Sequence, residues 1–284
     1  MDSPKPLISI VTPSYNQARF LEATIQSVLS QNYPRLEYII MDGGSTDGSL
    51  EIIQRYATYL TYWVSERDKG QVDAINRGFA HSSGDILGWI NSDDTYEPGA
   101  LQKVAAIFNN NPEVNLIYGE GWYIDEYGKR IKPCKFVRDS FPHVYITNKD
   151  PILQQAAFWR RSLWEKIGPL NDTFNWVFDW EWFIRAHKQT KFYYIPEFLG
   201  DYRIQPQAKT RSTDIRRRVE QARITKQYGN WWHPNYLVQQ TRIIEYYALK
   251  SFRPLPRSMT KYLGFLASIP RRLAEALFYG RYVS

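Results

Sequence analysis

The chain has 284 residues, a formal net charge of +7 and a single cysteine, Cys134. Its apolar fraction of 43% excludes a disordered chain, and one cysteine excludes both a disulfide framework and a cysteine-cluster zinc site. No run of about 20 apolar residues predicts a spanning helix, and the first residues lack the apolar stretch of a signal peptide. We therefore expect a cytoplasmic protein, and its basic charge indicates an anionic partner.

The first half of the chain alternates strand and helix patterns. Short apolar, β-branched runs predict strands over residues 7–11, 36–41, 60–65, 85–90 and 114–118. Between them, apolar residues recur at three- and four-residue spacing, which predicts helices over 20–31, 49–56, 71–80 and 99–109. This alternation is typical of an α/β fold with a mostly parallel sheet and helices on both faces.

The second half is less regular. A hairpin is predicted over residues 121–132, with its turn at 125–128, and short elements follow: strands at 156–160 and 191–195, and helices at 162–167 and 179–187. Acidic residues thin out after about Asp214, while arginine and lysine continue. The last predicted helices are therefore basic: 214–228, 236–250 and 270–279.

Three polar loops follow predicted strands, at residues 12–17, 42–48 and 91–94. Ligands of parallel sheets bind beyond the carboxyl ends of the strands, so these loops are expected to converge. Asp42 begins the second loop, and a carboxylate there can accept a hydrogen bond from a base or a ribose. The same loop also has the composition of an ordinary turn that caps a helix.

The third loop, residues 91–94, contains the adjacent carboxylates Asp93 and Asp94 and is named the acidic loop. Two carboxylates at the end of a buried strand are costly unless they are paired, hydrogen-bonded or neutralised by a cation. Oxygen ligands suit Mg²⁺ or Mn²⁺, which typically bridge a carboxylate to substrate phosphates. The alternative is a solvated turn before the helix at Gly99.

A further acidic pair lies in the second half, at Asp179 and Glu181. Residues two positions apart on a helix point about 200° apart, so the two carboxylates need not share a face. We expect Glu181 to form a salt bridge with a neighbour such as Arg185, and Asp179 to act either as a helix cap or as a functional group. Aromatic residues make up 16% of the chain, which suits sugar stacking, and three tryptophans are expected to frame a sugar here: Trp176, Trp180 and Trp182.

The order and spacing of these motifs resemble the family 2 glycosyltransferases, inverting enzymes with a GT-A fold. The resemblance covers about residues 7–205. Matching segments in the first half are 8–16, 21–31, 42–47, 76–78, 84–86, 89–94 and 98–101. In the second half the match is thinner, at 155, 158–161, 168–170 and 179–181.

The resemblance implies a nucleotide-sugar donor, linked to UDP, GDP or dTDP, held by the first half. Thr12, Pro13 and Tyr15 would line the base pocket and Asp42 would contact the base. The other donor-binding residues would be Asn16, Asn91 and Ser92. Asp93 matches the metal-bound carboxylate of the family's Asp-x-Asp motif, with Asp94 as the alternative ligand for Mn²⁺ or Mg²⁺. Asp179 matches the base that activates the acceptor.

Two positions depart from the family pattern. Asn91 stands where the first Asp of Asp-x-Asp is expected, which removes a negative charge. Gln205 stands where many relatives have His, which puts an extra metal or phosphate ligand in doubt.

We therefore predict a GT-A catalytic domain over residues 1–230, with a donor half (1–120) and an acceptor half (121–230), and a basic amphipathic helical extension over 231–284. The predicted function is inverting sugar transfer to a saccharide or lipid-linked acceptor in cell-envelope or extracellular polysaccharide synthesis. The extension is expected either to touch an anionic membrane surface or a partner, or to pack on the catalytic domain. An inactive GT-A-like scaffold or a basic nucleic-acid-binding protein is the alternative, but the acidic loop would repel a polyanion.

Overall fold

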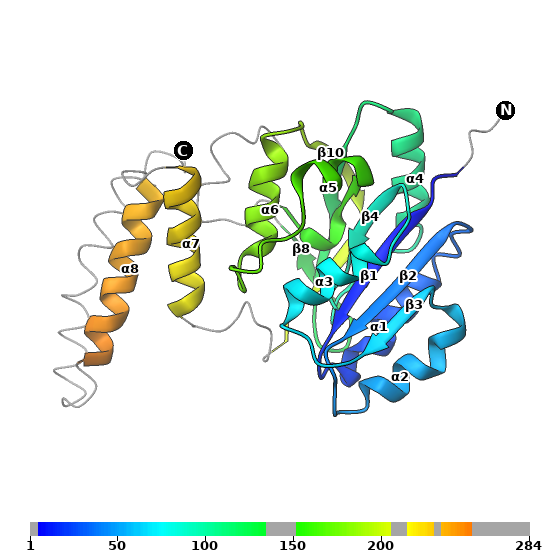
Figure 1. The fold of residues 1–284 in the computed structure, drawn as a ribbon, viewed down its shortest axis with the longest axis horizontal. Helices are drawn as coiled ribbons and strands as arrows, with labels where there is room; N and C mark the ends of the chain where they lie inside the picture. The colour runs from blue at the N-terminus through cyan, green and yellow to red at the C-terminus, as the bar shows by residue number, and fades with distance from the viewer. Residues whose placement is uncertain (1–4, 135–151, 206–214, 230–233, 252–284) are drawn as a thin grey trace. The chain divides into compact units, whose positions relative to one another are not determined.

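The computed structural model describes residues 5–134, 152–205, 215–229 and 234–251 (Figure 1). The chain divides into two compact units, one of residues 1–141 with 150–208 and one of residues 142–149 with 209–284. The predicted boundary at residue 230 would separate the last two described helices, whereas both fall in the second unit. The predicted helix at 270–279 lies outside the described residues.

The first unit is built on a seven-stranded sheet of order β10-β6-β9-β4-β1-β2-β3. Four neighbouring strands are parallel: β1 (Ile8–Ser14), β2 (Leu36–Asp42), β3 (Tyr62–Ser65) and β4 (Ile86–Trp89). β9 (Ala157–Arg160) is antiparallel to both of its neighbours, and the remaining strands are β6 (Leu116–Glu120) and β10 (Tyr193–Phe198). The mostly parallel α/β sheet predicted from the sequence is thus confirmed.

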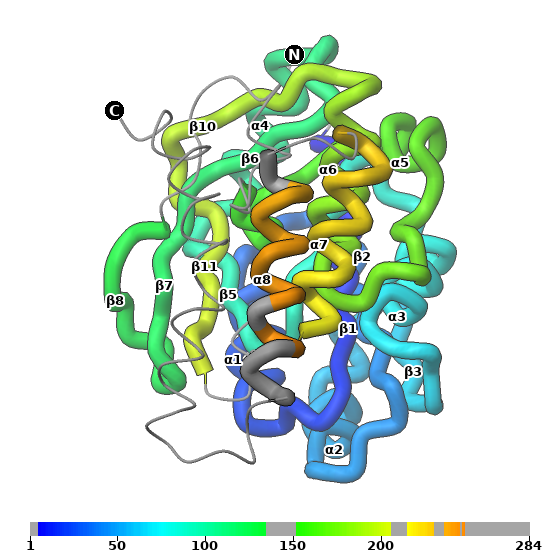
Figure 2. Tube along the Cα trace, turned by 90° about the vertical axis from the view of Figure 1, so that its left-hand side faces the viewer, coloured from blue at the N-terminus to red at the C-terminus, as the bar shows by residue number. Residues whose placement is uncertain are grey.

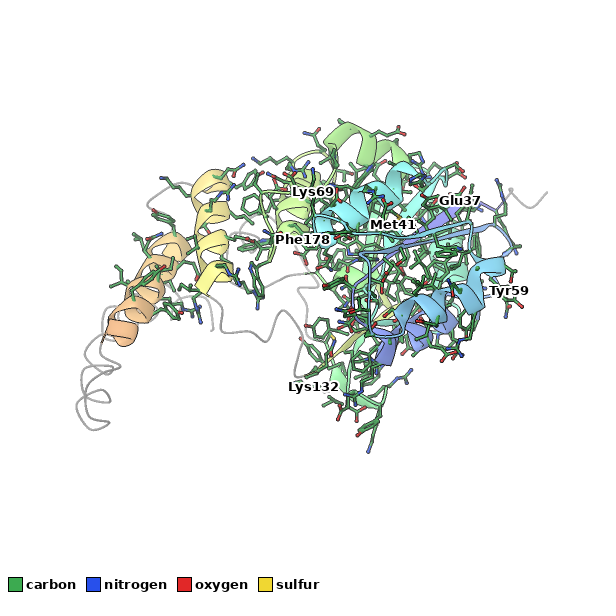
Figure 3. The ribbon with its side chains drawn as sticks, turned by 60° about the horizontal axis from the view of Figure 1, so that its bottom comes forward. Glu37, Met41, Tyr59, Lys69, Lys132 and Phe178 are labelled. Atoms are coloured by element: carbon green, nitrogen blue, oxygen red, sulfur yellow. The ribbon has the colours of Figure 1, made fainter. Side chains whose placement is uncertain are left out.

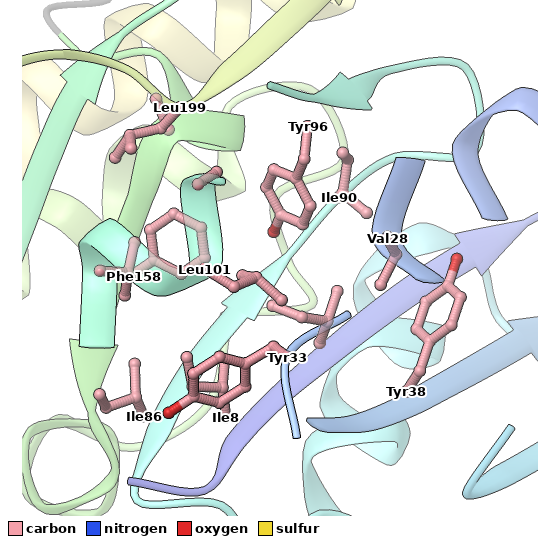
Figure 4. Packing of buried hydrophobic residues seen from close by; sticks show 14 of the residues in the cluster. Ile8, Val28, Tyr33, Tyr38, Ile86, Ile90, Tyr96, Leu101, Phe158 and Leu199 are labelled. Carbon is pink, nitrogen blue, oxygen red and sulfur yellow. The ribbon is translucent and has the colours of Figure 1, made fainter. Parts of the chain in front are cut away.

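One face of the sheet packs on α1 (Ala18–Leu29), α2 (Ser49–Tyr56) and α4 (Ala100–Asn110). Strand residues at alternate positions supply this core because successive side chains point to opposite faces. Ile8 and Ile86 pack with Val28 of α1 and Leu101 of α4 in one buried cluster (Figure 4).

The opposite face packs on α3 (Gln71–Ala80), α5 (Arg161–Ile167) and α6 (Phe178–His187). Gly78 lets α3 approach the sheet closely, because a Cβ atom there would collide with Val11 of β1. The core on this side is aromatic: Phe79 contacts Trp89 of β4 and Trp159 of β9, and Trp182 of α6 packs on Trp159. Much of the tryptophan content of the chain is therefore structural.

A second, four-stranded sheet of order β5-β11-β7-β8 lies in the same unit. Its strands are β7 (Trp122–Ile124) and β8 (Arg130–Pro133), which form the predicted hairpin, with β5 (Thr95–Tyr96) and β11 (Gly200–Arg203). The sequence patterns did not predict β5 or β11, which are only two and four residues long. β5 begins one residue after Asp94, so this sheet adjoins the acidic loop.

The described part of the second unit consists of α7 (Ile215–Tyr228) and α8 (Pro234–Ser251), which lie side by side (Figure 2). Ala222 and Ile224 of α7 and Val238 of α8 are buried. In the described residues, no helix is long and apolar enough to cross a membrane.

Candidate active site

The carboxyl ends of the parallel strands form one edge of the sheet. Ser14, Asp42 and Ser65 end β1, β2 and β3 and lie in register across them. The loops beyond are joined directly: the Asn16 backbone N–H donates to Ser45 Oγ at 2.8 Å, and the Thr46 N–H donates to Asn16 Oδ1 at 2.9 Å. The loop after β4, the other neighbour of β1, leaves the sheet at the same edge. The predicted convergence of the three loops is confirmed.

The residues predicted to line a base pocket differ in exposure. Thr12 and Pro13 are buried, and the Thr12 hydroxyl lies 3.1 Å from the hydroxyl of Tyr38. Tyr15 is 63% exposed, so its ring is the one of the three that a ligand could cover directly. Asn16 has a φ of +51°, a left-handed conformation that asparagine tolerates better than most residues.

Asp42 is 2% exposed and is held by its own loop. Its Oδ2 accepts hydrogen bonds from the Ser45 N–H at 2.9 Å and the Ser65 hydroxyl at 2.7 Å, and its Oδ1 accepts one from the Ser45 hydroxyl at 2.5 Å. These bonds tie the end of β2 to β3 and to the turn that follows. The contact of Asp42 with a base stays a prediction.

Asp94 is 1% exposed and is enclosed by protein donors. The Arg203 backbone N–H donates to Oδ1 at 2.8 Å, while the amides of Asn91, at 3.1 Å, and Gln155 donate to Oδ2. Burial raises the pKa of Asp94 well above its ordinary value, and the neighbouring Asp93 raises it further, against the lowering effect of these donors. Asp94 thus links the acidic loop to β11 through a buried hydrogen bond.

Asp93 is the more accessible carboxylate of the pair. Its side chain is half-buried, and its Oδ2 accepts a hydrogen bond from the amide of Gln205 at 2.6 Å. Burial raises its pKa, whereas the Gln205 amide and the charge of Arg203 lower it. The guanidinium of Arg203, 3% exposed, donates through Nε to the Asp93 carbonyl at 2.6 Å and through Nη1 to the Asp125 carbonyl at 2.9 Å. Arg203 therefore supplies a buried positive charge in contact with the backbone of the acidic loop.

Asn91 connects the acidic loop to α3. Its Oδ1 accepts a hydrogen bond from Gln71 at 2.8 Å, and its amide donates to Asp94. A carboxylate at residue 91 could not make that donation, which gives a physical reason for asparagine here. Ser92, beside it, is buried.

Asp179 lies in the first turn of α6, half-buried, and its Oδ1 accepts a hydrogen bond from the Trp180 N–H at 2.8 Å. The preceding residue, Phe178, packs on Trp89, with ring centroids 6.4 Å apart. Trp89 is the last residue of β4, two before Asn91, so the start of α6 lies close to the end of the strand that carries the acidic loop. Figure 3 labels Phe178 and also Met41, the neighbour of Asp42 in β2.

Glu181 forms the predicted salt bridge, because Nε of Arg185 lies 3.0 Å from its Oε1. The prediction that three tryptophans frame a sugar is wrong for two of them. Trp182 is fully buried and donates to the Gly168 carbonyl at 3.1 Å, and Trp180 is 5% exposed. The two rings point about 200° apart on the helix, so α6 is buried on more than one side, whereas Trp176, before the helix, is partly exposed.

Gln71, Gln155 and Arg203 hold the acidic loop in place, and no sequence pattern predicted this role for them. Each lies at least 20 positions from its partner in the loop. The only sequence feature that pointed to two of these residues was the thin match to the family near residues 155 and 205. In the described residues no group of three or more His, Cys, Asp or Glu side chains is placed to hold a metal ion by itself.

A mostly parallel sheet with three polar loops at the carboxyl ends of its strands is the architecture of a GT-A fold. The sequence profile described as Glycosyl transferase family 2 matches residues 9–168. The chain belongs to this family.

Two relatives show how far the similarity extends. An uncharacterized glycosyltransferase of Mycobacterium tuberculosis is 32% identical over 186 residues, which cover 64% of this chain and 69% of the relative. A PGL/p-HBAD biosynthesis glycosyltransferase of Mycobacterium bovis is also 32% identical over 186 residues, covering 64% of this chain and 70% of its own.

Solved structures share the fold at low sequence identity. The Staphylococcus aureus protein TarS (residues 1–349), in complex with UDP-GlcNAc, has a TM-score of 0.63 at 12% identity, covering 96% of this chain and 92% of that one. The mannosyltransferase PcManGT of Pyrobaculum calidifontis, in complex with GDP-Man and Mn²⁺, has a TM-score of 0.56 at 16% identity, covering 99% and 76%.

Proposed function

We propose that the protein is an inverting glycosyltransferase that moves a sugar from a nucleoside-diphosphate sugar to an acceptor hydroxyl. The observation that supports this most is the acidic loop, in which Asp94 is buried among protein donors while Asp93 stays partly exposed at the carboxyl ends of the parallel strands. The solved neighbours carry UDP-GlcNAc or GDP-Man, which favours a nucleotide-sugar donor here. We further propose, from the family resemblance, a saccharide or lipid-linked acceptor used in cell-envelope or extracellular polysaccharide synthesis; one relative is named a PGL/p-HBAD biosynthesis glycosyltransferase.

The residues present fit a divalent cation that is bound jointly with the donor. Asp93 offers a carboxylate oxygen, the ligand type that Mg²⁺ and Mn²⁺ prefer, and one carboxylate suffices when substrate phosphates complete the coordination. Such a cation would offset the negative charge of the leaving diphosphate. Asp94, whose oxygens are already used by Arg203, Gln155 and Asn91, positions Asp93 and does not bind the cation.

Asp179 is the proposed general base. In a single displacement the acceptor oxygen bonds to the anomeric carbon, the bond from that carbon to the diphosphate oxygen breaks, and the hydroxyl proton passes to a carboxylate on the acceptor side. Glu181 is buried and paired with Arg185, whereas Asp179 is a partly exposed carboxylate in the first turn of α6. Inversion follows because the acceptor attacks from the face opposite the leaving group.

The test is release of nucleoside diphosphate from a panel of UDP-, GDP- and dTDP-sugars, with and without EDTA. We expect Asp179→Asn to lower kcat by roughly 10²- to 10⁴-fold while leaving donor affinity in calorimetry nearly unchanged. Asp93→Asn should remove the response to Mn²⁺ in both turnover and donor binding.

Asp172→Asn serves as the matched control, since Asp172 is an exposed carboxylate seven residues before Asp179. Full activity of Asp179→Asn, together with an inactive Glu181→Gln, would assign the base to Glu181. Full activity in excess EDTA would contradict the proposal that a divalent cation is required.

We also propose that the second unit, which includes α7 as well as α8 of the predicted extension, contacts an anionic membrane surface. Residues 215–251 contain seven Lys or Arg and two Asp or Glu. Three exposed cations of α7, Arg216, Arg223 and Lys226, share one helix face, and α8 exposes Ile244 and Tyr247. Membrane association generally needs both charge attraction and apolar insertion, and this helix pair offers both.

Co-sedimentation with vesicles of phosphatidylglycerol and phosphatidylcholine tests this contact. The double substitution Ile244→Ser and Tyr247→Ser should reduce binding, whereas Tyr59→Ser, on an exposed tyrosine of the first unit, should not. Equal binding by all three proteins would exclude α8 as the contact.

A further inference from the structure

Gln205 holds the partly exposed carboxylate of Asp93 from inside the protein. It lies two residues beyond the end of β11 and is 2% exposed. Its side-chain amide donates to Oδ2 of Asp93 at 2.6 Å, a short hydrogen bond of the kind that a charged acceptor forms. In the described part of the chain, no other side chain donates to this carboxylate. The amide of Gln205 therefore sets how the carboxylate of Asp93 is turned.

This hydrogen bond also fixes which end of the Gln205 amide meets the carboxylate. The nitrogen of a side-chain amide donates hydrogen bonds, and its oxygen only accepts them. An ionised carboxylate only accepts, so the nitrogen must face Asp93. The amide oxygen, the one atom of Gln205 suited to bind a divalent cation, is then directed away from the Asp93 oxygen that accepts the bond.

The backbone of Asp93 is fixed by other contacts. Nε of Arg203 donates to its carbonyl oxygen at 2.6 Å. The next residue, Asp94, accepts the Arg203 N–H at 2.8 Å through its side chain, and its carbonyl accepts the hydroxyl of Thr24 at 2.7 Å. With the backbone held, the Asp93 carboxylate can still turn about its side-chain torsions, and the bond to Gln205 restricts that rotation.

An amide orients the carboxylate without cancelling its charge. The ion pairs of the described residues do not include Asp93 or Asp94, and Arg203 donates to the backbone oxygen of Asp93. A lysine in the place of Gln205 could also hold Asp93, but its positive charge would compete with a cation for the same carboxylate. A neutral donor therefore suits a position beside a cation ligand.

We propose that Gln205 is a positioning residue, which holds Oδ2 of Asp93 and presents Oδ1 to a divalent cation that arrives with the nucleotide. The inference rests on the proposed function. Gln205 does not bind the cation itself, because its own oxygen is directed away. A single carboxylate holds Mg²⁺ or Mn²⁺ only when substrate phosphates complete the coordination. The cation therefore binds and leaves together with the nucleoside diphosphate.

Calorimetry with nucleoside diphosphates, in Mn²⁺ and in EDTA, measures what the cation adds. UDP, GDP and dTDP are titrated into the wild-type protein, and the one that binds most tightly is used for the variants. Mn²⁺ should tighten its binding at least about tenfold. Gln205→Leu should lose most of this gain, since removing a residue that orients a metal ligand typically costs about 10- to 100-fold in metal affinity. Its affinity in EDTA should equal that of the wild-type protein.

Gln31→Leu is the matched control. Gln31 is also buried, and its amide donates to the backbone carbonyls of Ser27 and Glu97 and not to a carboxylate. This variant should keep the wild-type response to Mn²⁺. Urea midpoints establish that the compared proteins are folded.

Gln205→Glu tests the same assignment by gain of binding. The substitution keeps the shape of the side chain but replaces the amide donor with a second carboxylate. Mn²⁺ titrated into nucleotide-free wild-type protein should give no measurable binding, whereas Gln205→Glu should bind it, because two carboxylates then share the cation.

The outcomes separate the two claims. If the wild-type protein binds none of the nucleotides, or binds them equally in Mn²⁺ and in EDTA, the proposed function with its cation fails. If the wild-type protein responds to Mn²⁺ and Gln205→Leu responds equally, the proposed function stands and Gln205 does not position Asp93. An equal loss by Gln205→Leu in Mn²⁺ and in EDTA would indicate a structural role alone and overturn the inference. Tight Mn²⁺ binding by nucleotide-free wild-type protein would also overturn it, because that requires a second protein ligand.

Discussion

Asp201 makes the stability of the second sheet depend on pH. It lies on β11, 7% exposed, and its Oδ1 accepts a hydrogen bond from the Trp122 N–H at 3.0 Å. Its carboxyl group also meets Glu97, which is itself paired with Arg130 at 2.6 Å. Burial, and then the charge of Glu97, raise the pKa of Asp201 to about 7.

The sign follows from the direction of this shift. The folded protein holds the Asp201 proton more tightly than the unfolded chain, in which an aspartate titrates near 3.9. The stabilising contribution is therefore complete below about pH 4 and is lost as the pH rises to about 7. One pKa unit corresponds to about 1.4 kcal/mol, so the free energy of unfolding falls by up to about 4 kcal/mol over this range.

Asp201→Asn removes the titration while keeping the shape. The amide oxygen can still accept the Trp122 N–H, and the amide nitrogen can donate to Glu97 at every pH. Urea unfolding followed by tryptophan fluorescence at pH 5, 6, 7 and 8 measures the effect. At pH 8 the variant should be more stable than wild type by roughly 1–4 kcal/mol, and this difference should shrink as the pH falls to 5, by about 1.4 kcal/mol for each pH unit below 7.

Asp172→Asn is the control for loss of a carboxylate, because Asp172 is exposed. It should keep the pH dependence of the wild-type protein. If Asp201→Asn keeps the same dependence, the reasoning about the Asp201–Glu97 pair is refuted.

Three further substitutions test the packing around the site. Gly78→Ala should lower the free energy of unfolding by about 1–3 kcal/mol, because the added methyl collides with Val11; an unchanged urea midpoint would contradict the close approach of α3 to β1. Trp182→Ala should cost about 3–5 kcal/mol, since this ring is fully buried against Trp159 and Trp164, and a smaller loss would mean that the aromatic core relaxes around it. Arg203→Lys keeps the charge but loses the bonds to the Asp93 and Asp125 carbonyls, so calorimetry should show weaker Mn²⁺-dependent donor binding; wild-type affinity would exclude a positioning role.

Local patterns determined the main elements of the first unit. The helix at 71–80 and the helix at 49–56 have the predicted bounds, because apolar spacing and flanking glycines are encoded within each segment. The alternation of strand and helix implied parallel strands, and parallel strands place the loops after β1, β2 and β4 at one edge. The candidate carboxylates could thus be found from the sequence.

The tertiary structure decided which of these carboxylates are available. Asp94 and Asp42 are held by donors from distant segments, Arg203 on a four-residue strand and Ser65 at the end of β3, and no local pattern encodes such contacts. Trp180 and Trp182 were predicted to stack on a sugar, but the packing of α6 buries both rings. Chain order and spacing determine which groups lie at the edge, whereas hydrogen bonds between distant segments determine which of them remain free to meet a ligand.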